Sequence, residues 1–443
     1  MKKKILTFGI VLFAIAIVTA TAVLFLFPYD PLQPPVADDT DSTVEGIEEV
    51  VNANNKFAFD LYNEISKSGN KNLFFSPYSI STALVMTYEG AEGQTAEEMK
   101  NVFHFPENDI LRPNSAAIYN QINKKDKSYT LRTGNALWAQ QDHYFLEDYM
   151  GRVEKYYGGK VANLDFKQEP EKSRQTINNF IAEQTNNRIE EIIGPGRLDP
   201  NTRLILTNAI YFLGDWKYQF DKKNTQDVDF FITPHNPIKV PMMYMSKSNM
   251  GNMKPEPARF NYAELDKLQI IELPYKDNEL SMIIILPKQG EVYDYETSEL
   301  IKYEYTLEDI DFTFEKFNEY KDQMEETSME EIYLPKFEFK TEYSLNEILI
   351  NLGMSTAFDM NGADFSGMTG NKSLYISDII HKAFVKVDEK GTEAAAATAV
   401  ILKDESFNPS QNIFKADHPF MFVIQETETG NILFIGNVIN PLQ

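Results

Sequence analysis

The stretch that decides the fold reads Lys386-Val-Asp-Glu-Lys-Gly-Thr-Glu-Ala-Ala-Ala-Ala-Thr-Ala-Val400. It follows an apolar run typical of a β-strand, Ala383–Val387, that ends in charged residues typical of a turn. By intrinsic propensity the alanines favour a helix. At a period of two, however, one face carries only side chains that are neither bulky nor charged, Thr392, Ala394, Ala396 and Thr398. Such a segment is an alanine-rich helix or linker, a flexible exposed loop, or a strand that can enter between two others without steric or charge penalty.

Composition excludes several classes of function. The 443 residues include 66 acidic and 42 basic residues, a formal net charge of −24, and no cysteine. Without cysteine the chain has no disulfide, no thiolate metal site and no cysteine nucleophile. An acidic chain also lacks the basic surface that nucleic acids and other polyanions require. We therefore expect no nucleic-acid partner, no polyanionic activator, no metal and no cofactor.

The N-terminal residues have the pattern of a membrane segment. Lys2, Lys3 and Lys4 precede an uncharged run of 23 residues, Ile5–Phe27, which is long enough to cross a bilayer as a helix. We interpret residues 1–27 as a signal anchor that contacts the membrane through residues 5–27. The lysines then stay in the cytoplasm and the rest of the chain lies on the extracellular face. If the segment is instead cleaved after Ala20-Thr21-Ala22, the protein is secreted.

The remainder of the chain is expected to comprise a spacer and one folded domain. Residues 28–45 are rich in proline and acid, and Asp38–Glu49 is expected to be a solvated tether. Helical periodicity covers 50–66, 79–90, 95–102 and 174–193, and Thr95 with Glu98 fits a capping box. Strand-like runs cover 204–212, 269–273, 281–286, 332–339, 383–387, 420–425 and 432–438. This mixture, without regular βαβ alternation, predicts an α+β fold over residues 46–443.

No sequence pattern for catalysis is present. The chain has no G-x-S-x-G, Walker, H-E-x-x-H or G-x-G-x-x-G motif. The five histidines are scattered and none lies in a local signature of a Ser–His–Asp triad: His104, His143, His235, His381 and His418. We therefore do not expect an enzyme, although a hydrolase with an undetected triad remains the third class of function considered.

Nine segments together resemble the serpin family. Glu389-Lys-Gly-Thr-Glu-Ala-Ala-Ala-Ala-Thr398 is similar to the hinge of an inhibitory serpin's reactive loop. The others follow in family order across nearly all of residues 46–443: Asn72–Ile80, Leu206–Trp216, Lys239–Met243, Glu272–Tyr275, Leu280–Met282, Ala363–Met368, Ala416–Phe420, and Leu433–Asn437 with Asn440-Pro441. The resemblance implies a serpin fold, a single domain of about nine helices and three β-sheets with an exposed reactive-centre loop.

The resemblance also implies the activity. A serpin of the inhibitory type is a serine-type endopeptidase inhibitor and a suicide substrate. Its loop is cleaved and then inserted into the central sheet, which traps the protease as an acyl-enzyme. The protein is then a monomer whose partner is a serine or cysteine protease. The alternative is a non-inhibitory serpin that acts as a chaperone, carrier or storage protein. The small residues of the hinge favour the inhibitor.

Site residues follow from the same resemblance. The loop hinge comprises Glu389, Gly391, Thr392, Glu393, Ala394, Ala395, Ala396, Ala397 and Thr398. The polar residues beneath the sliding strands, together with the tryptophan where insertion starts, are Ser76, Ser79, Asn208, His381 and Trp216. The sixteenth residue after Glu389 is Glu405, so the reactive bond is Glu405–Ser406 and the partner is a glutamate-preferring protease with a basic pocket. Counting back from Pro419 gives Asn408 instead, and Asp404 and Lys403 remain alternatives.

Two features depart from or add to this pattern. Residues 288–333 carry 15 acids and four lysines, are rich in tyrosine, and appear longer than the family norm. They form either a surface insertion or a docking surface for a basic partner. Asn371-Lys-Ser373 is a glycosylation sequon.

Overall fold

The structure, a computed structural model, describes residues 36–443 except residues 70, 125, 234, 252–256, 295–298 and 393–411. This part holds ten α-helices and three large β-sheets, one helix more than expected, and the α+β class is confirmed. The helices are α2 (Val44–Ser66), α3 (Pro77–Tyr88), α4 (Gly93–Val102), α5 (Asn108–Ile122), α6 (Glu147–Tyr157), α7 (Pro170–Gln184), α8 (Lys247–Gly251), α9 (Phe314–Lys321), α10 (Asn346–Leu352) and α11 (Ser366–Thr369).

Two details of the helices differ from the sequence pattern. The predicted helix 174–193 ends at Gln184. Asn186 and Asn187 adopt left-handed backbone angles, which asparagine tolerates but which a right-handed helix cannot include. The predicted capping box of Thr95 and Glu98 is wrong. Helix α4 begins at Gly93, and the Glu98 carboxylate instead accepts hydrogen bonds from the backbone and hydroxyl of Thr356.

The central sheet contains the strands that position the site. Its order is β15 (Phe337–Ser344), β16 (Ile376–Val387), β17 (Gly391–Thr392), β5 (Leu204–Asp215), β3 (Ala136–Gln140) and β4 (Lys160–Leu164), and β2 (Tyr129–Thr133) continues β3 along β5. Strands β16 and β5 are parallel and pair directly from Ile376 with Leu204 to Ala383 with Ile210. Beyond that point they separate, and the two residues of β17 lie between them.

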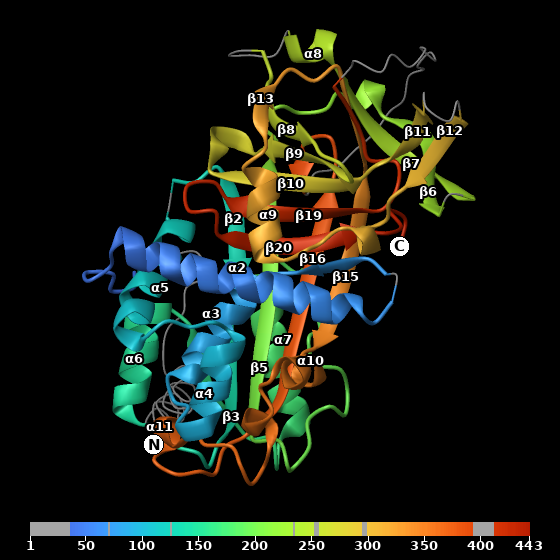
Figure 1. Cartoon of the computed structure of the whole chain (residues 1–443). Coiled ribbons are helices and arrows are strands. Elements are labelled where there is room, and N and C mark those ends of the chain that lie inside the picture. Colours follow the sequence, from blue (N-terminus) through green and yellow to red (C-terminus); the bar gives the residue numbers. More distant parts are fainter. Residues whose placement is uncertain are drawn as a thin grey trace, which may run out of the picture.

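Two further sheets pack against and beyond this one. The second has the order β1 (Leu73–Phe75), β20 (Ile432–Val438), β19 (Phe420–Glu426), β10 (Leu280–Pro287), β9 (Leu268–Pro274), β8 (Phe260–Glu264) and β13 (Glu325–Thr327). The third has the order β18 (Ile413–Lys415), β14 (Glu331–Pro335), β7 (Asn236–Ser246) and β6 (Gln226–Thr233). Figure 1 shows β19 and β20 crossing the long strands β5 and β16. Every residue of β10, β19 and β20 is buried, which explains their largely apolar sequences.

The first part of the acidic tract 288–333 forms a hairpin, and the rest contributes α9, β13 and β14. Strands β11 (Gln289–Asp294) and β12 (Glu299–Glu304) pair with each other in a separate two-stranded sheet. Figure 1 shows this hairpin at the end of the molecule opposite α11. The predicted run 332–339 is two strands in two sheets, β14 and β15, because Pro335 cannot donate to a ladder and the Lys336 backbone bonds to Pro241 of β7.

The expected solvated tether instead lies against the domain. Ala37 is 3% exposed, and its backbone N–H and carbonyl both hydrogen-bond to the side chain of Asn120 on α5, each at 2.9 Å. The backbone N–H of Asp38 donates to the carbonyl of Lys155 on α6 at 2.7 Å, and the two side chains form an ion pair. Residues 36–43 therefore form a strap over α5 and α6, since an acidic segment can dock where a helix presents an amide and a lysine.

We predict that Asn120→Ala destabilises the domain by about 1–2 kcal/mol, because it removes three strap hydrogen bonds worth roughly 0.5–1.5 kcal/mol each. Guanidinium unfolding of the two proteins measures the difference. Gln121→Ala, on the exposed face of the same helix, is the matched control and should leave the unfolding midpoint nearly unchanged. Equal midpoints for Asn120→Ala and the wild type would show that the strap is not fixed in solution.

The predicted membrane segment, residues 1–27, lies outside the described residues. Among the residues that the structure does describe, no helix is both long enough and apolar enough to cross a bilayer.

Candidate functional site

The first residues of the hinge already form part of the central sheet. Gly391 and Thr392 pair with Asp215 and Gly214 of β5, and Thr392 also pairs with Val387 of β16. Glycine is required at 391 because a Cβ there would collide with the carbonyl oxygen of Gly214. Thr392 is 2% exposed. The hinge therefore starts as a strand between β5 and β16, directly above the point where those strands meet.

Aromatic side chains hold the start of the hinge. The Thr392 hydroxyl and the Tyr275 hydroxyl are 2.7 Å apart and hydrogen-bonded, and burial raises the pKa of Tyr275 far above its ordinary value. Trp216 stacks on Tyr275 with ring centroids 4.5 Å apart. The Trp216 indole donates to the carbonyl of Asp388 at 3.0 Å, and its backbone N–H donates to the carbonyl of Lys390 at 2.7 Å. The structure thus brings Trp216 to the hinge, and it adds Tyr275, to which the sequence assigned no role.

Two side chains from distant parts of the sequence hold the Glu389 carboxylate in place. Its carboxylate accepts from the Lys336 ammonium at 2.9 Å and from the Thr225 hydroxyl at 2.8 Å. Burial acts to raise the pKa of Glu389, but these hydrogen bonds and the lysine charge outweigh it and lower the pKa below its ordinary value. Glu389 is therefore an ionised anchor at the start of the predicted hinge.

A buried polar cluster lies beneath β5 and β16. The Asn208 amide of β5 donates to the carbonyl and hydroxyl oxygens of Ser79, each at 2.7 Å, and to Asn135 at 2.6 Å. The backbone N–H of Ser76 donates to Nε2 of His381 at 3.2 Å, so Nε2 is the unprotonated nitrogen and Nδ1 donates to Asn208. The four predicted residues thus meet in one network. Asn135 completes it and was missed, because one asparagine between two strand segments gives no signal in a sequence.

Burial gives His381 a specific effect on stability. It is fully buried, and desolvation lowers its pKa to about 3 from an ordinary value of 6.5. As the pH falls below 6.5 the unfolded chain takes up a proton that the folded chain cannot, so stability is lost as the pH falls from 6.5 towards 3. We predict that this residue removes about 1.4 kcal/mol between pH 7.5 and pH 5.5. Denaturant unfolding of wild type and His381→Gln at both pH values measures it. An equal pH dependence in the two proteins would contradict the assignment.

The remaining predicted site residues lie outside the described residues. These are Glu393, Ala394, Ala395, Ala396, Ala397, Thr398, Glu405 and Ser406. Their roles stay predictions. The described chain resumes at Asn412 and continues directly into β18, so both ends of the loop are placed.

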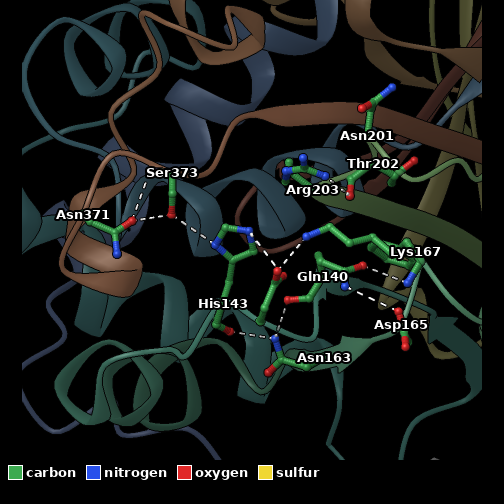
Figure 2. Close-up of polar contacts among 12 residues, drawn as sticks. Gln140, His143, Asn163, Asp165, Lys167, Asn201, Thr202, Arg203, Asn371 and Ser373 are labelled. Atoms are coloured by element: carbon green, nitrogen blue, oxygen red, sulfur yellow. Dashed lines mark hydrogen bonds and ion pairs between the residues drawn. The ribbon is translucent and has the colours of Figure 1, made fainter.

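One Ser–His–Asp grouping exists, but its hydrogen bonds are wrong for catalysis. Figure 2 shows Ser373 between Asn371 and His143, with its hydroxyl 3.1 Å from His143 Nδ1. The backbone N–H of Ser373 fixes Asn371 Oδ1 as an acceptor, and the Ser373 hydroxyl donates its single proton to that oxygen. His143 must therefore donate to Ser373 and cannot be its base.

The acidic member of the grouping is also misplaced. The Asp142 carboxylate is 3.8 Å from His143 Nε2 and pairs with Lys167 at 2.6 Å. Burial lowers the pKa of His143 in spite of this neighbour. The described residues contain no cluster of three or more histidine or carboxylate side chains arranged for a metal. This arrangement gives the hydrolase hypothesis no support.

The described residues thus place a short strand between two long parallel strands, above a polar network that bridges them. The family model described as serpin, serine protease inhibitor, matches residues 52–441. An uncharacterised serpin-like protein of Methanosarcina mazei is 42% identical over 400 residues, which are 89% of this chain and 88% of that one. The leukocyte elastase inhibitor of Xenopus laevis is 39% identical and matches 89% of this chain and 100% of its own.

A solved structure is similar over the same region. Uncleaved ovalbumin matches with a TM-score of 0.73 at 29% identity, covering 88% of this chain and all of the other. The chain belongs to the serpin family, and the serpin fold expected from the sequence is confirmed. Serpins are serine protease inhibitors and generally not enzymes, and relatives of the present chain include proteins named as elastase inhibitors.

Proposed function

We propose that this serpin is a serine protease inhibitor that acts as a suicide substrate. The protease serine attacks the carbonyl carbon of Glu405, the bond to Ser406 breaks, and the new amine leaves with a proton. The resulting ester links protease and inhibitor. The freed loop then enters between β5 and β16, carries the protease with it and distorts the active site before water can hydrolyse the ester.

The position of β17 is the observation that supports this proposal most strongly. Antiparallel continuation of the pairing between Thr392 and Val387 brings residue 403 opposite Ile376, the first residue of β16. Glu405 would then emerge two residues beyond the end of the sheet, which leaves the ester to the protease outside the strand. At a period of two, the side chains that follow Thr392 in the sequence are Ala394, Ala396, Thr398 and Val400, and none of them is bulky or charged.

The energy of insertion is sufficient for a trap. A strand of about a dozen residues gains on the order of 10 kcal/mol from backbone hydrogen bonds at ~0.5–1.5 kcal/mol each. This is comparable to the whole stability of a typical domain, ~5–15 kcal/mol. The uncleaved fold is then held by a kinetic barrier.

A panel of proteases tests the proposal. Residues 36–443 are incubated with glutamate-specific, trypsin-like, chymotrypsin-like and subtilisin-like enzymes. We expect a complex that survives denaturing electrophoresis with the glutamate-specific enzyme, and mass spectrometry should place the cut at Glu405–Ser406. A cut after Lys403, Asp404 or Asn408 would move the reactive bond and the preferred protease but keep the mechanism. Simple cleavage without a complex by every enzyme would favour the non-inhibitory chaperone, carrier or storage function.

We further propose that residues 5–27 anchor the inhibitor to the extracellular face of the cell membrane. The support is the uncharged run of 23 residues behind three lysines. Carbonate extraction of membranes from cells that express the full chain should leave the protein in the pellet. Release into the medium with a new N-terminus near residue 22 would instead show a cleaved signal peptide and a secreted inhibitor.

A further inference from the structure

A cavity of about 50 Å³ lies among helices α2, α3 and α5, and it uses none of the hinge residues or of the polar cluster beneath β5 and β16. Its apolar wall comes from Val50 and Ala53 of α2, Val85 of α3, and Leu111 and Ile118 of α5. A water molecule needs roughly 10–15 Å³ on this scale, so the space suits about four waters or one organic molecule of about four or five non-hydrogen atoms. Figure 1 shows the three helices side by side.

Three buried polar atoms without hydrogen-bond partners lie in this one cavity. They are Asn54 Oδ1, Ser81 Oγ and Asn431 Nδ2. Asn54 is 7% exposed and Asn431 is 1% exposed. A buried polar group without a partner is costly, and native proteins leave few of them. A molecule in this cavity could therefore form hydrogen bonds to all three atoms.

The hydrogen bonds that Asn54 and Asn431 already make determine whether the free end of each amide is a donor or an acceptor. The Asn54 amide nitrogen donates to the carbonyl of Ile432 at 3.0 Å, which only the NH2 end of an amide can do. The same nitrogen donates to Asn431 Oδ1 at 2.8 Å. The free end of Asn54 is therefore an acceptor and the free end of Asn431 is a donor, so the cavity presents one of each.

The turn that carries Asn431 is rigidly held. Asn55 accepts from the backbone N–H of Ile432 at 2.9 Å and donates to the carbonyl of Gly430 at 2.9 Å. The donor and the acceptor are thus positioned before any molecule binds, which lowers the entropy cost of binding.

We infer that this cavity is a binding site for a small neutral molecule with a primary carboxamide group and a short aliphatic chain. The amide oxygen would accept from Asn431 Nδ2, the amide nitrogen would donate to Asn54 Oδ1, and the Ser81 hydroxyl can serve either atom. None of the described residues that line the cavity is charged, which disfavours an ion. Ser81, Thr82 and Ser115 are only half-buried and form the side through which a longer chain would leave.

Calorimetric titration of the full chain with propanamide tests this inference. We expect saturable binding of one molecule per chain with a Kd on the order of 1 mM, as suits a ligand of five non-hydrogen atoms. At ten times that Kd the ratio of folded to unfolded protein should rise about 11-fold, seen as a higher unfolding midpoint. Propanoate, which is charged, and butanone, which lacks the donor, should each bind at least about tenfold more weakly. Equal binding of all three compounds would overturn the amide assignment.

Variants separate this site from any other. Ser81→Val fills the cavity and should abolish binding, whereas Ser81→Ala keeps its volume, removes one polar atom and should weaken binding about three- to tenfold. Asn108 also has a free buried oxygen but does not line the cavity, so Asn108→Ala is the matched control and should bind like the wild type. A crystal soaked in propanamide that shows only ordered water on the three atoms, or wild-type binding by Ser81→Val, would overturn the inference.

Discussion

Under the proposed mechanism, Thr392→Arg is expected to make the protein an ordinary substrate of its target protease. Thr392 is 2% exposed between β5 and β16, and its hydroxyl bonds to Tyr275. An arginine cannot occupy that space, and burying its charge without a partner costs several kcal/mol. The hinge should therefore leave the sheet and insertion should become slower than hydrolysis of the acyl-enzyme. A barrier higher by about 3 kcal/mol lowers the trapped fraction more than 100-fold.

Denaturing electrophoresis of the variant with the protease identified by the panel measures this effect. The cut site should stay the same while the covalent complex disappears and cleaved protein accumulates. Thr392→Val keeps the size of the side chain, removes only its hydrogen bond, and should still form the complex. This control separates the effect of a side chain that is too large from the effect of losing one hydrogen bond. A stable complex with Thr392→Arg would refute insertion as the trapping step.

Glu89→Gln is expected to cause the largest loss of stability among substitutions away from the hinge. The Glu89 side chain is completely buried at the end of α3. It accepts two hydrogen bonds from Arg112 of α5, both at 2.8 Å, and further bonds from Arg152 and Tyr157 of α6. One carboxylate therefore joins three helices. Glutamine keeps the shape but leaves two arginines facing a neutral amide.

We expect a loss of about 3 kcal/mol in the free energy of unfolding, at the low end for a broken buried ion pair because both arginines are partly exposed and can reach water. Guanidinium unfolding at pH 7.5 measures it. Glu107→Gln is the matched control, since Glu107 pairs with Lys100 on the surface with 76% of its side chain exposed, and the unfolding midpoint should hardly change. Similar midpoints for the two variants would show that Glu89 does not hold the helices together.

The local sequence pattern predicted most of the helices and strands correctly but did not predict where they end. The apolar runs at 281–286, 420–425 and 432–438 correspond to β10, β19 and β20 within one or two residues, because burial on both faces leaves a continuous signal. The run 174–193 was too long as a helix, since the left-handed angles at Asn186 and Asn187 depend on the packing of the turn. Asp38–Glu49 was expected in water because it is acidic, but its docking depends on Asn120 and Lys155, which no local pattern reveals.

The sequence by itself determined the family and predicted the hinge and the polar residues beneath the sheet. Each of these rests on residues at fixed local spacing, such as Gly391 and Thr392 before the alanines. Only the tertiary structure decided which groups hold them: Tyr275 against Thr392, Lys336 against Glu389, and Asn135 in the network of Asn208. The same holds for the cavity, whose Asn54 and Asn431 are 377 positions apart. The spacing of residues in the sequence indicates which side chains share one face of a helix or strand. Which side chains they contact on another element depends on how the strands pair and how the sheets pack.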